Sequence, residues 1–93
     1  MTSTGIGGPS AAISLEELSH IGVDAVIRVG TCGGMQKHVS VGDLILPTAA
    51  VRMEGTSREY MPIEYPAAAD FSIISTLSQA ARENALPYHT GVI

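Results

Sequence analysis

The stretch that most constrains the fold is residues 23–34, where an apolar run passes directly into a glycine-rich segment. Val23–Val29 is nearly continuously apolar, which is typical of a parallel strand buried on both faces of a sheet. Arg28 lies at the end of this run, and Thr31 follows among glycines. A cation, a hydroxyl and a closely approachable backbone at the carboxyl end of a strand can bind an anion. The spacing alone predicts either an anion site or an exposed glycine-rich turn with a solvated arginine.

A second glycine-rich loop, Gly5–Ser10, leads into a predicted helix at Pro9–Ile21. Such a loop can bind phosphate or give backbone ligands to a cation, or its glycines can simply permit tight helix packing. Thr2–Gly5 has the pattern of a strand end, so strand, helix and strand would form a right-handed crossover. We therefore expect this loop and Arg28–Gly34 to converge on one crevice at the same sheet edge.

The rest of the chain alternates between strand and helix patterns. Asp43 is predicted to cap a turn, and Lys37 and His38 before it are predicted to be exposed. The overall pattern predicts an α/β fold with a mixed β-sheet flanked by helices. The remaining predicted elements are a strand at Leu44–Leu46 that Pro47 ends or kinks, a strand at Thr48–Met53, a charged loop at Glu54–Tyr60, a helix at about Asp70–Asn84 and a strand at Tyr88–Ile93.

Composition limits the classes of protein to which the chain can belong. Its 93 residues suffice for one small domain, and 45% hydrophobic residues predict a core. A formal net charge of -4 argues against nucleic-acid binding, so an anion would have to be met locally by Arg28. The single cysteine excludes an internal disulfide and suits a reducing compartment. No apolar run approaches the roughly 20 residues of a membrane span, so we expect a cytoplasmic protein that does not contact membranes.

The side chains near the glycine-rich loop favour binding over covalent chemistry. Cys32 could be a nucleophile, but the sequence places no histidine beside it as a base, so we interpret it as a small contact residue. No histidine or cysteine pair has the spacing of a zinc site. Arg28 can offer paired donors and Thr31 a hydroxyl, which together orient and neutralise an anion.

Four segments, in the same order along the chain, resemble the nucleoside phosphorylase family that includes uridine phosphorylase and hexameric purine nucleoside phosphorylase. The resemblance extends over essentially all 93 residues. A further stretch, Arg52–Ser57 ahead of Ile63–Pro66, is most similar to uridine phosphorylases. The four segments are Ser3–Ile13 with Glu17 and Leu18 after it, Arg28–Gly33, Val41–Asp43 and Pro66–Phe71.

The resemblance implies a three-layer α/β/α fold in which residues 1–93 are the central portion of a single domain, without its N- and C-terminal parts. It implies a pentosyltransferase that carries out reversible phosphorolysis of a nucleoside, here uridine, to free base and ribose 1-phosphate. The partners are then the nucleoside and phosphate, with phosphate as co-substrate and no required cofactor. It also implies a homo-oligomer built from dimers, a hexamer in the full-length protein.

Site residues follow from the resemblance position by position. Arg28 and Thr31 match the phosphate-binding arginine and hydroxyl, and Thr31, Cys32 and Gly33 match residues around the nucleoside. Ile6, by its carbonyl, and Ser10 match two ligands of a potassium ion at the dimer interface of some uridine phosphorylases. No residue of this segment is assigned as catalytic. Cys32 departs from the threonine of many bacterial uridine phosphorylases and is similar to the purine-specific relatives.

The family's first phosphate loop and its base- and ribose-recognition segments have no counterpart in these 93 residues. We therefore expect the chain alone to be inactive. Three other functions stay open: a purine nucleoside phosphorylase, a hydrolytic nucleosidase, and a non-catalytic anion- or nucleotide-binding module. Arg28 favours phosphate over water as co-substrate, since a hydrolase has no need of that cation.

Overall fold

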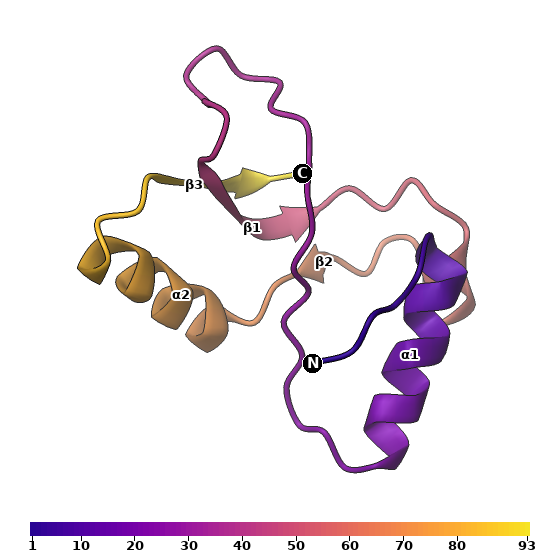
Figure 1. The fold of residues 1–93 in the computed structure, drawn as a ribbon. Coiled ribbons are helices and arrows are strands. Elements are labelled where there is room, and N and C mark those ends of the chain that lie inside the picture. Colours follow the sequence, from indigo (N-terminus) through magenta and orange to yellow (C-terminus); the bar gives the residue numbers. More distant parts are fainter. The chain divides into compact units, whose positions relative to one another are not determined.

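The computed structural model describes all residues from Met1 to Ile93. It contains two α-helices, one short 3-10 helix and a three-stranded mixed sheet (Figure 1), so the predicted α/β class is confirmed. The chain forms two compact units, a first unit of Met1–Thr31 with Met53–Glu64 and a second unit of Cys32–Arg52 with Tyr65–Ile93. The elements in chain order are α1 (Gly8–His20), β1 (Leu44–Ala50), η1 (Thr56–Glu59), β2 (Ala67–Ala68), α2 (Phe71–Glu83) and β3 (Tyr88–Val92).

The sheet of the second unit has the order β2-β1-β3, with β1 in the centre. β1 is parallel to β3 and antiparallel to the two-residue strand β2. The predicted strands on either side of Pro47 are one strand, and the pairing with β3 shifts register between Pro47 and Ala49. Proline has no N–H to donate to a ladder, so an irregularity is the expected cost of placing it inside a strand. Pro47 thus disturbs β1 without ending it.

Helix α2 packs against β1 in the second unit (Figure 1). The Asp70 carboxylate begins the helix, accepting hydrogen bonds from the Ile73 N–H at 3.0 Å and the Ser72 hydroxyl at 2.6 Å. These bonds hold the pKa of Asp70 below its usual value. Ala81 is the one buried residue of the chain, at 3% exposure. The predicted helix is confirmed. Of the residues that the i, i+3/i+4 spacing predicts on its apolar face, Ala81 is buried, Ala80 is exposed, and Ile73, Ile74 and Leu77 are partly buried.

The C-terminus of α2 closes with a Schellman motif. The Leu86 N–H donates to the Ala81 carbonyl at 2.9 Å, and the Ala85 N–H donates to the Arg82 carbonyl at 3.0 Å. This motif requires a left-handed residue after the cap, and Ala85 takes that conformation with φ of 52°. Glycine normally fills this position because a Cβ is disfavoured there.

In the first unit, α1 follows a loop that is shaped by left-handed glycines. Gly5 and Gly7 have φ of 68° and 92°, and Pro9 occupies the first turn of the helix. The helix begins and ends within one residue of its predicted bounds, and Gly22 follows with φ of 82°. The start and stop signals in the sequence therefore place α1 correctly.

The predicted strand at Val23–Val29 is wrong, as is the strand end at Thr2–Gly5. Neither segment has strand structure or a backbone partner in the sheet. The predicted crossover between them is therefore not formed. Apolar side chains favour burial in a sheet, but a strand exists only where a neighbouring strand supplies hydrogen bonds. β1, the central strand of this sheet, has both of its edges paired with β2 and β3.

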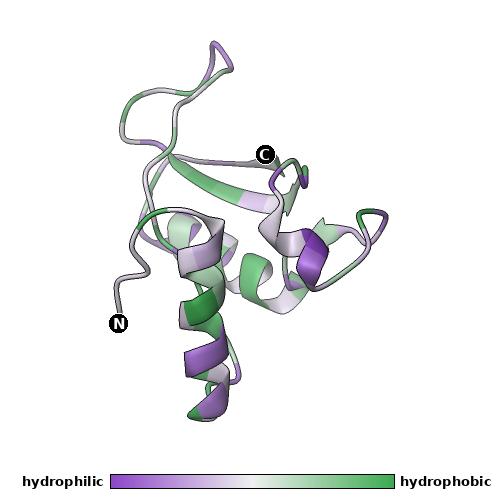
Figure 2. Cartoon of the chain, turned by 90° about the vertical axis from the view of Figure 1, so that its right-hand side faces the viewer, coloured by the Kyte–Doolittle hydropathy of each residue, from purple (hydrophilic) through white to green (hydrophobic).

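The chain exposes much apolar surface, although its composition predicts a core. Figure 2 shows apolar stretches in both helices, in the strands and in the coil. Ile13 and Ile21 of the α1 region are 65% and 77% exposed, and Phe71 at the start of α2 is 86% exposed. Exposed apolar surface on this scale is uncommon in a monomeric soluble protein. Neither helix is long and apolar enough to cross a bilayer.

A turn at residues 40–43 is joined to β3 by one carboxylate. Asp43 Oδ2 accepts a hydrogen bond from the Ser40 N–H at 2.8 Å and lies 2.8 Å from His89 Nε2. The Ser40 bond, and then the His89 bond, hold the pKa of Asp43 below its usual value. The predicted capping role of Asp43 is confirmed, and its contact with His89 adds a link between distant parts of the chain.

Replacing Ala85 by glycine should stabilise the fold. Ala85→Gly removes the Cβ from a left-handed residue and should raise the free energy of unfolding by about 0.5–1 kcal/mol. Ala80→Gly is the matched control, because Ala80 lies in the helix interior and should lose about 1 kcal/mol. Urea denaturation of both variants measures this. A lower stability for Ala85→Gly would contradict the assigned C-terminal motif.

Asp43 should make the fold sensitive to acid. Because its folded-state pKa is depressed, its stabilisation is present above the unfolded pKa of about 4 and is lost as the pH falls through the lower folded value. Asp43→Asn should therefore flatten the acid side of the curve of stability against pH. Thermal denaturation between about pH 2 and pH 7 tests this. Parallel acid profiles for the two proteins would show that Asp43 contributes nothing through its charge.

Candidate functional site

The residues from Arg28 to Gly34 are all exposed and have no regular secondary structure. The Arg28 guanidinium folds back over Gly30, where a Cβ would lie only 3.4–3.6 Å from the guanidinium atoms. No residue of the chain forms an ion pair with Arg28. Its N–H donors, which can form a fork of paired hydrogen bonds, are thus available to an anion.

The other predicted contact residues follow Arg28 directly in the chain. Thr31, Cys32 and Gly33 are all exposed, and Cys32 is a free thiol. Thr31 belongs to the first unit and the other two to the second. None of these three residues has a hydrogen bond within the chain that would occupy its polar atoms.

The Gly5–Ser10 loop is held by a local hydrogen bond. The Ser10 hydroxyl donates to the Thr4 carbonyl, and a Cβ on Gly5 would lie 2.9 Å from that hydroxyl oxygen. Only glycine suits Gly5, both for this close approach and for its positive φ. The Ser10 oxygen keeps lone pairs that can face a cation, and the Thr4 carbonyl beside it is a second hard oxygen. These oxygens suit potassium better than a transition metal, and no cluster of three or more His, Cys, Asp or Glu could hold a metal ion.

No hydrogen bond links the Gly5–Ser10 loop to Arg28 in this chain. The crevice expected between the two loops stays a prediction from the sequence.

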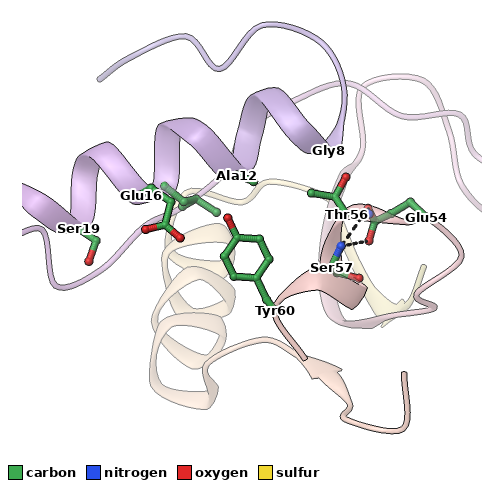
Figure 3. Close-up of a pocket in the computed structure, with 9 residues that line it drawn as sticks. Gly8, Ala12, Glu16, Ser19, Glu54, Thr56, Ser57 and Tyr60 are labelled. Atoms are coloured by element: carbon green, nitrogen blue, oxygen red, sulfur yellow. Dashed lines mark hydrogen bonds between the residues drawn. The ribbon is translucent and has the colours of Figure 1, made fainter. Parts of the chain in front are cut away.

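The structure does have a hollow of about 420 Å³, which lies between α1 and η1 in the first unit. Figure 3 shows Glu16 of α1 and the Tyr60 phenol pointing towards one another across it. Partial burial, and then the Glu16 carboxylate, raise the pKa of Tyr60. The lining residues are Gly8, Ala12, Leu15, Glu16, Ser19, Glu54, Thr56, Ser57 and Tyr60.

Glu54 fixes the short helix on one side of this hollow. Its carboxylate accepts hydrogen bonds from the Thr56 N–H at 2.7 Å and the Ser57 N–H at 3.0 Å. Hydrogen bonds from Ser57 and then Thr56 hold the pKa of Glu54 below its usual value. The charged loop predicted at Glu54–Tyr60 is therefore capped and ordered as η1.

Sequence reasoning did not find this hollow. Its α1 residues have the helical spacing i, i+4, i+7, i+8 and i+11 from Gly8, which places them on one face. This helical spacing could have been recognised in the sequence. The partner helix η1 could not, because its residues have the pattern of a loop. The lining has two carboxylates and no cation, so it does not suit phosphate. The predicted anion contact is Arg28, which is not among these lining residues.

Comparison with known proteins shows what the chain is similar to. It is 52% identical over 92 residues to a uridine phosphorylase of Thermococcus kodakarensis, covering 99% of this chain and 33% of that protein. It is 50% identical over 91 residues to a uridine phosphorylase of Treponema pallidum, covering 98% of this chain and 35% of that protein. It is 48% identical over 91 residues to a guanosine phosphorylase of Halorubrum lacusprofundi, covering 98% of this chain and 38% of that protein.

The chain thus spans about a third of the length of the curated relatives it matches. The sequence profile of the Phosphorylase superfamily matches residues 1–93, the whole chain. The resemblance inferred from the glycine-rich segments is confirmed, and this chain belongs to the Phosphorylase superfamily.

Proposed function

We propose that this chain is the central portion of a nucleoside phosphorylase domain that catalyses reversible phosphorolysis of uridine to uracil and ribose 1-phosphate. The observation that carries the proposal is its identity of 52% and 50% to two uridine phosphorylases over almost its entire length. The enzyme would be a pentosyltransferase with phosphate as co-substrate and no required cofactor. Its single cysteine and low net charge fit a cytoplasmic enzyme that binds small molecules.

The phosphate contacts are assigned to Arg28 and Thr31. The exposed guanidinium has no ionic partner within the chain, so it can form paired, charge-assisted bonds with a phosphate dianion. Thr31 adds a hydroxyl three residues along the same loop. Glycines around both residues leave the backbone open for close approach of the ligand.

The nucleoside contacts are assigned to Thr31, Cys32 and Gly33. Phosphorolysis passes through a transition state with positive charge at the anomeric carbon, as in other glycosyl transfers. A phosphate held by Arg28 provides both the nucleophile and the countercharge, so the residues of this chain need only orient the two substrates. This mechanism needs no side-chain nucleophile, which agrees with interpreting Cys32 as a contact residue.

A potassium ion is assigned to the Ile6 carbonyl and the Ser10 hydroxyl. Hard oxygen ligands of this kind suit potassium, and the hydrogen bond from Ser10 to Thr4 already gathers oxygens at the start of α1. When bound, the ion would screen these carbonyl dipoles and fix the loop.

The exposed apolar surface supports assembly with further protein. A chain in which only Ala81 is fully buried has little core of its own. We propose that neighbouring parts of the same domain cover this surface, and that the domain forms a homo-oligomer built from dimers, hexameric in the full-length protein. On this account the chain alone is inactive, because the remaining substrate contacts lie in other segments.

A purine nucleoside is the second candidate substrate. The observation that favours it is the 48% identity to a guanosine phosphorylase. The family resemblance adds that Cys32 is similar to purine-specific members. Both candidates use the same phosphate chemistry, so the choice between them concerns only the base.

The reaction is tested with full-length protein, uridine and varied phosphate. We expect release of uracil that depends on phosphate and saturates with it. Release of base without phosphate would identify a hydrolytic nucleosidase, and release from guanosine alone would identify the purine branch. Phosphate binding with no base release from either nucleoside would identify a non-catalytic binding module.

Arg28→Ala should weaken phosphate binding by about 10- to 100-fold, because charge-assisted hydrogen bonds of about 1.5–3 kcal/mol are lost. Isothermal titration of phosphate into the full-length protein measures this. Arg58→Ala is the matched control, since it removes the same charge from an exposed residue of η1 and should leave affinity unchanged. Equal phosphate affinity in wild type and Arg28→Ala would refute the assignment.

A further inference from the structure

Asp43, His89 and His38 form a cluster that joins two distant parts of the second unit. Asp43 Oδ2 and His89 Nε2 are 2.8 Å apart across 46 residues of sequence. The Asp43 and His89 side chains are 12% and 29% exposed, so this contact is partly buried. The His38 ring packs edge-on against the His89 ring, with centroids 5.2 Å apart and an interplanar angle of 61°. We call these three residues the His89 cluster.

The His89 cluster is attached to the paired strands β1 and β3. His89 lies in β3, where it pairs in register with Ile45 of the parallel strand β1. Leu44 begins β1 directly after Asp43, and its N–H donates to the Pro87 carbonyl at 2.9 Å. Both sides of the Asp43–His89 contact are therefore attached to the same strand ladder, which limits how far either can move.

The other end of the cluster leads back to the glycine-rich loop. Gly34 lies beside the Val39 side chain, since a Cβ added to Gly34 would be 3.0 Å from Val39 Cγ1. Val39 lies between His38 and Ser40, and its N–H donates to the Gln36 carbonyl at 3.1 Å. The Ser40 N–H is in turn bonded to Asp43. An unbroken series of contacts thus runs from β3 to Gly34, the neighbour of Cys32 and Gly33.

We propose that the His89 cluster positions the backbone of the residues that contact the nucleoside. Asp43 and His89 hold the turn at residues 36–43 on β3, and the turn holds the backbone of Cys32–Gly34 through the contact of Val39 with Gly34. This inference rests on the proposed function for its effect on catalysis. The cluster acts on nucleoside binding through the position of the backbone, while Arg28, the proposed phosphate contact, belongs to the first unit.

The kinetic test uses the full-length protein with His89→Ala and His89→Gln. His89→Ala removes the donor to Asp43 and should raise KM for the nucleoside about fivefold to tenfold, with kcat and KM for phosphate nearly unchanged. His89→Gln keeps an N–H donor and should recover most of the loss. His38→Ala, which removes only a ring contact, should give a smaller change in the same direction. His20→Ala is the control, because His20 bonds only to a carbonyl of its own helix.

A second readout does not depend on activity. Amide hydrogen exchange of residues 32–43 should be faster in His89→Ala than in wild type, with exchange in α2 unchanged. Unchanged exchange in residues 32–43 would overturn the proposal even if the wild type showed no phosphorolysis. Faster exchange in an inactive wild-type background would instead support the cluster and reject the proposed function. If His89→Ala lowered kcat and raised KM for both substrates, and His89→Gln did not restore them, His89 would have a general structural role. That result would also overturn the proposal.

Discussion

The parallel pairing of β1 with β3 is the interaction on which the second unit depends. It aligns Leu44 with Tyr88 and Ile45 with His89, so residues far apart in sequence become neighbours. Helix α2 packs on β1, and the Asp43–His89 contact forms at the end of the same ladder. Non-local pairing of this kind costs loop-closure entropy. Further contacts, such as the Schellman motif before β3, offset part of this loss of entropy.

Local signals predicted the helices well. Pro9 marks the start of α1 and Gly22 follows its end. Asp70 caps α2, as its position before the helix pattern suggested. These signals work because their partners lie within a few residues along the chain. The run Val23–Val29 has an equally clear strand pattern, yet it is not a strand here. A strand depends on a partner that its own sequence does not describe, so apolar patterning alone could not decide its pairing.

Some features of the candidate site could likewise be predicted from the sequence, and others could not. The residue types at Arg28 and Thr31 predicted anion binding, and the nucleoside contacts followed only from the resemblance to a family to which the chain belongs. The link from His89 through Asp43 and Val39 to Gly34 was not predictable, because it depends on the register of β3 against β1. The hollow between α1 and η1 was missed for a similar reason, since η1 lies in a stretch that reads as a loop.

If Arg28 binds the phosphate that attacks the nucleoside, the sugar product must carry that phosphate. Phosphorus NMR of full-length protein with uridine and phosphate follows the nucleophile itself. The account predicts that inorganic phosphate is consumed and that a ribose 1-phosphate signal grows in step with uracil. Release of uracil with free ribose and an undiminished phosphate signal would contradict it, because water would then be the nucleophile.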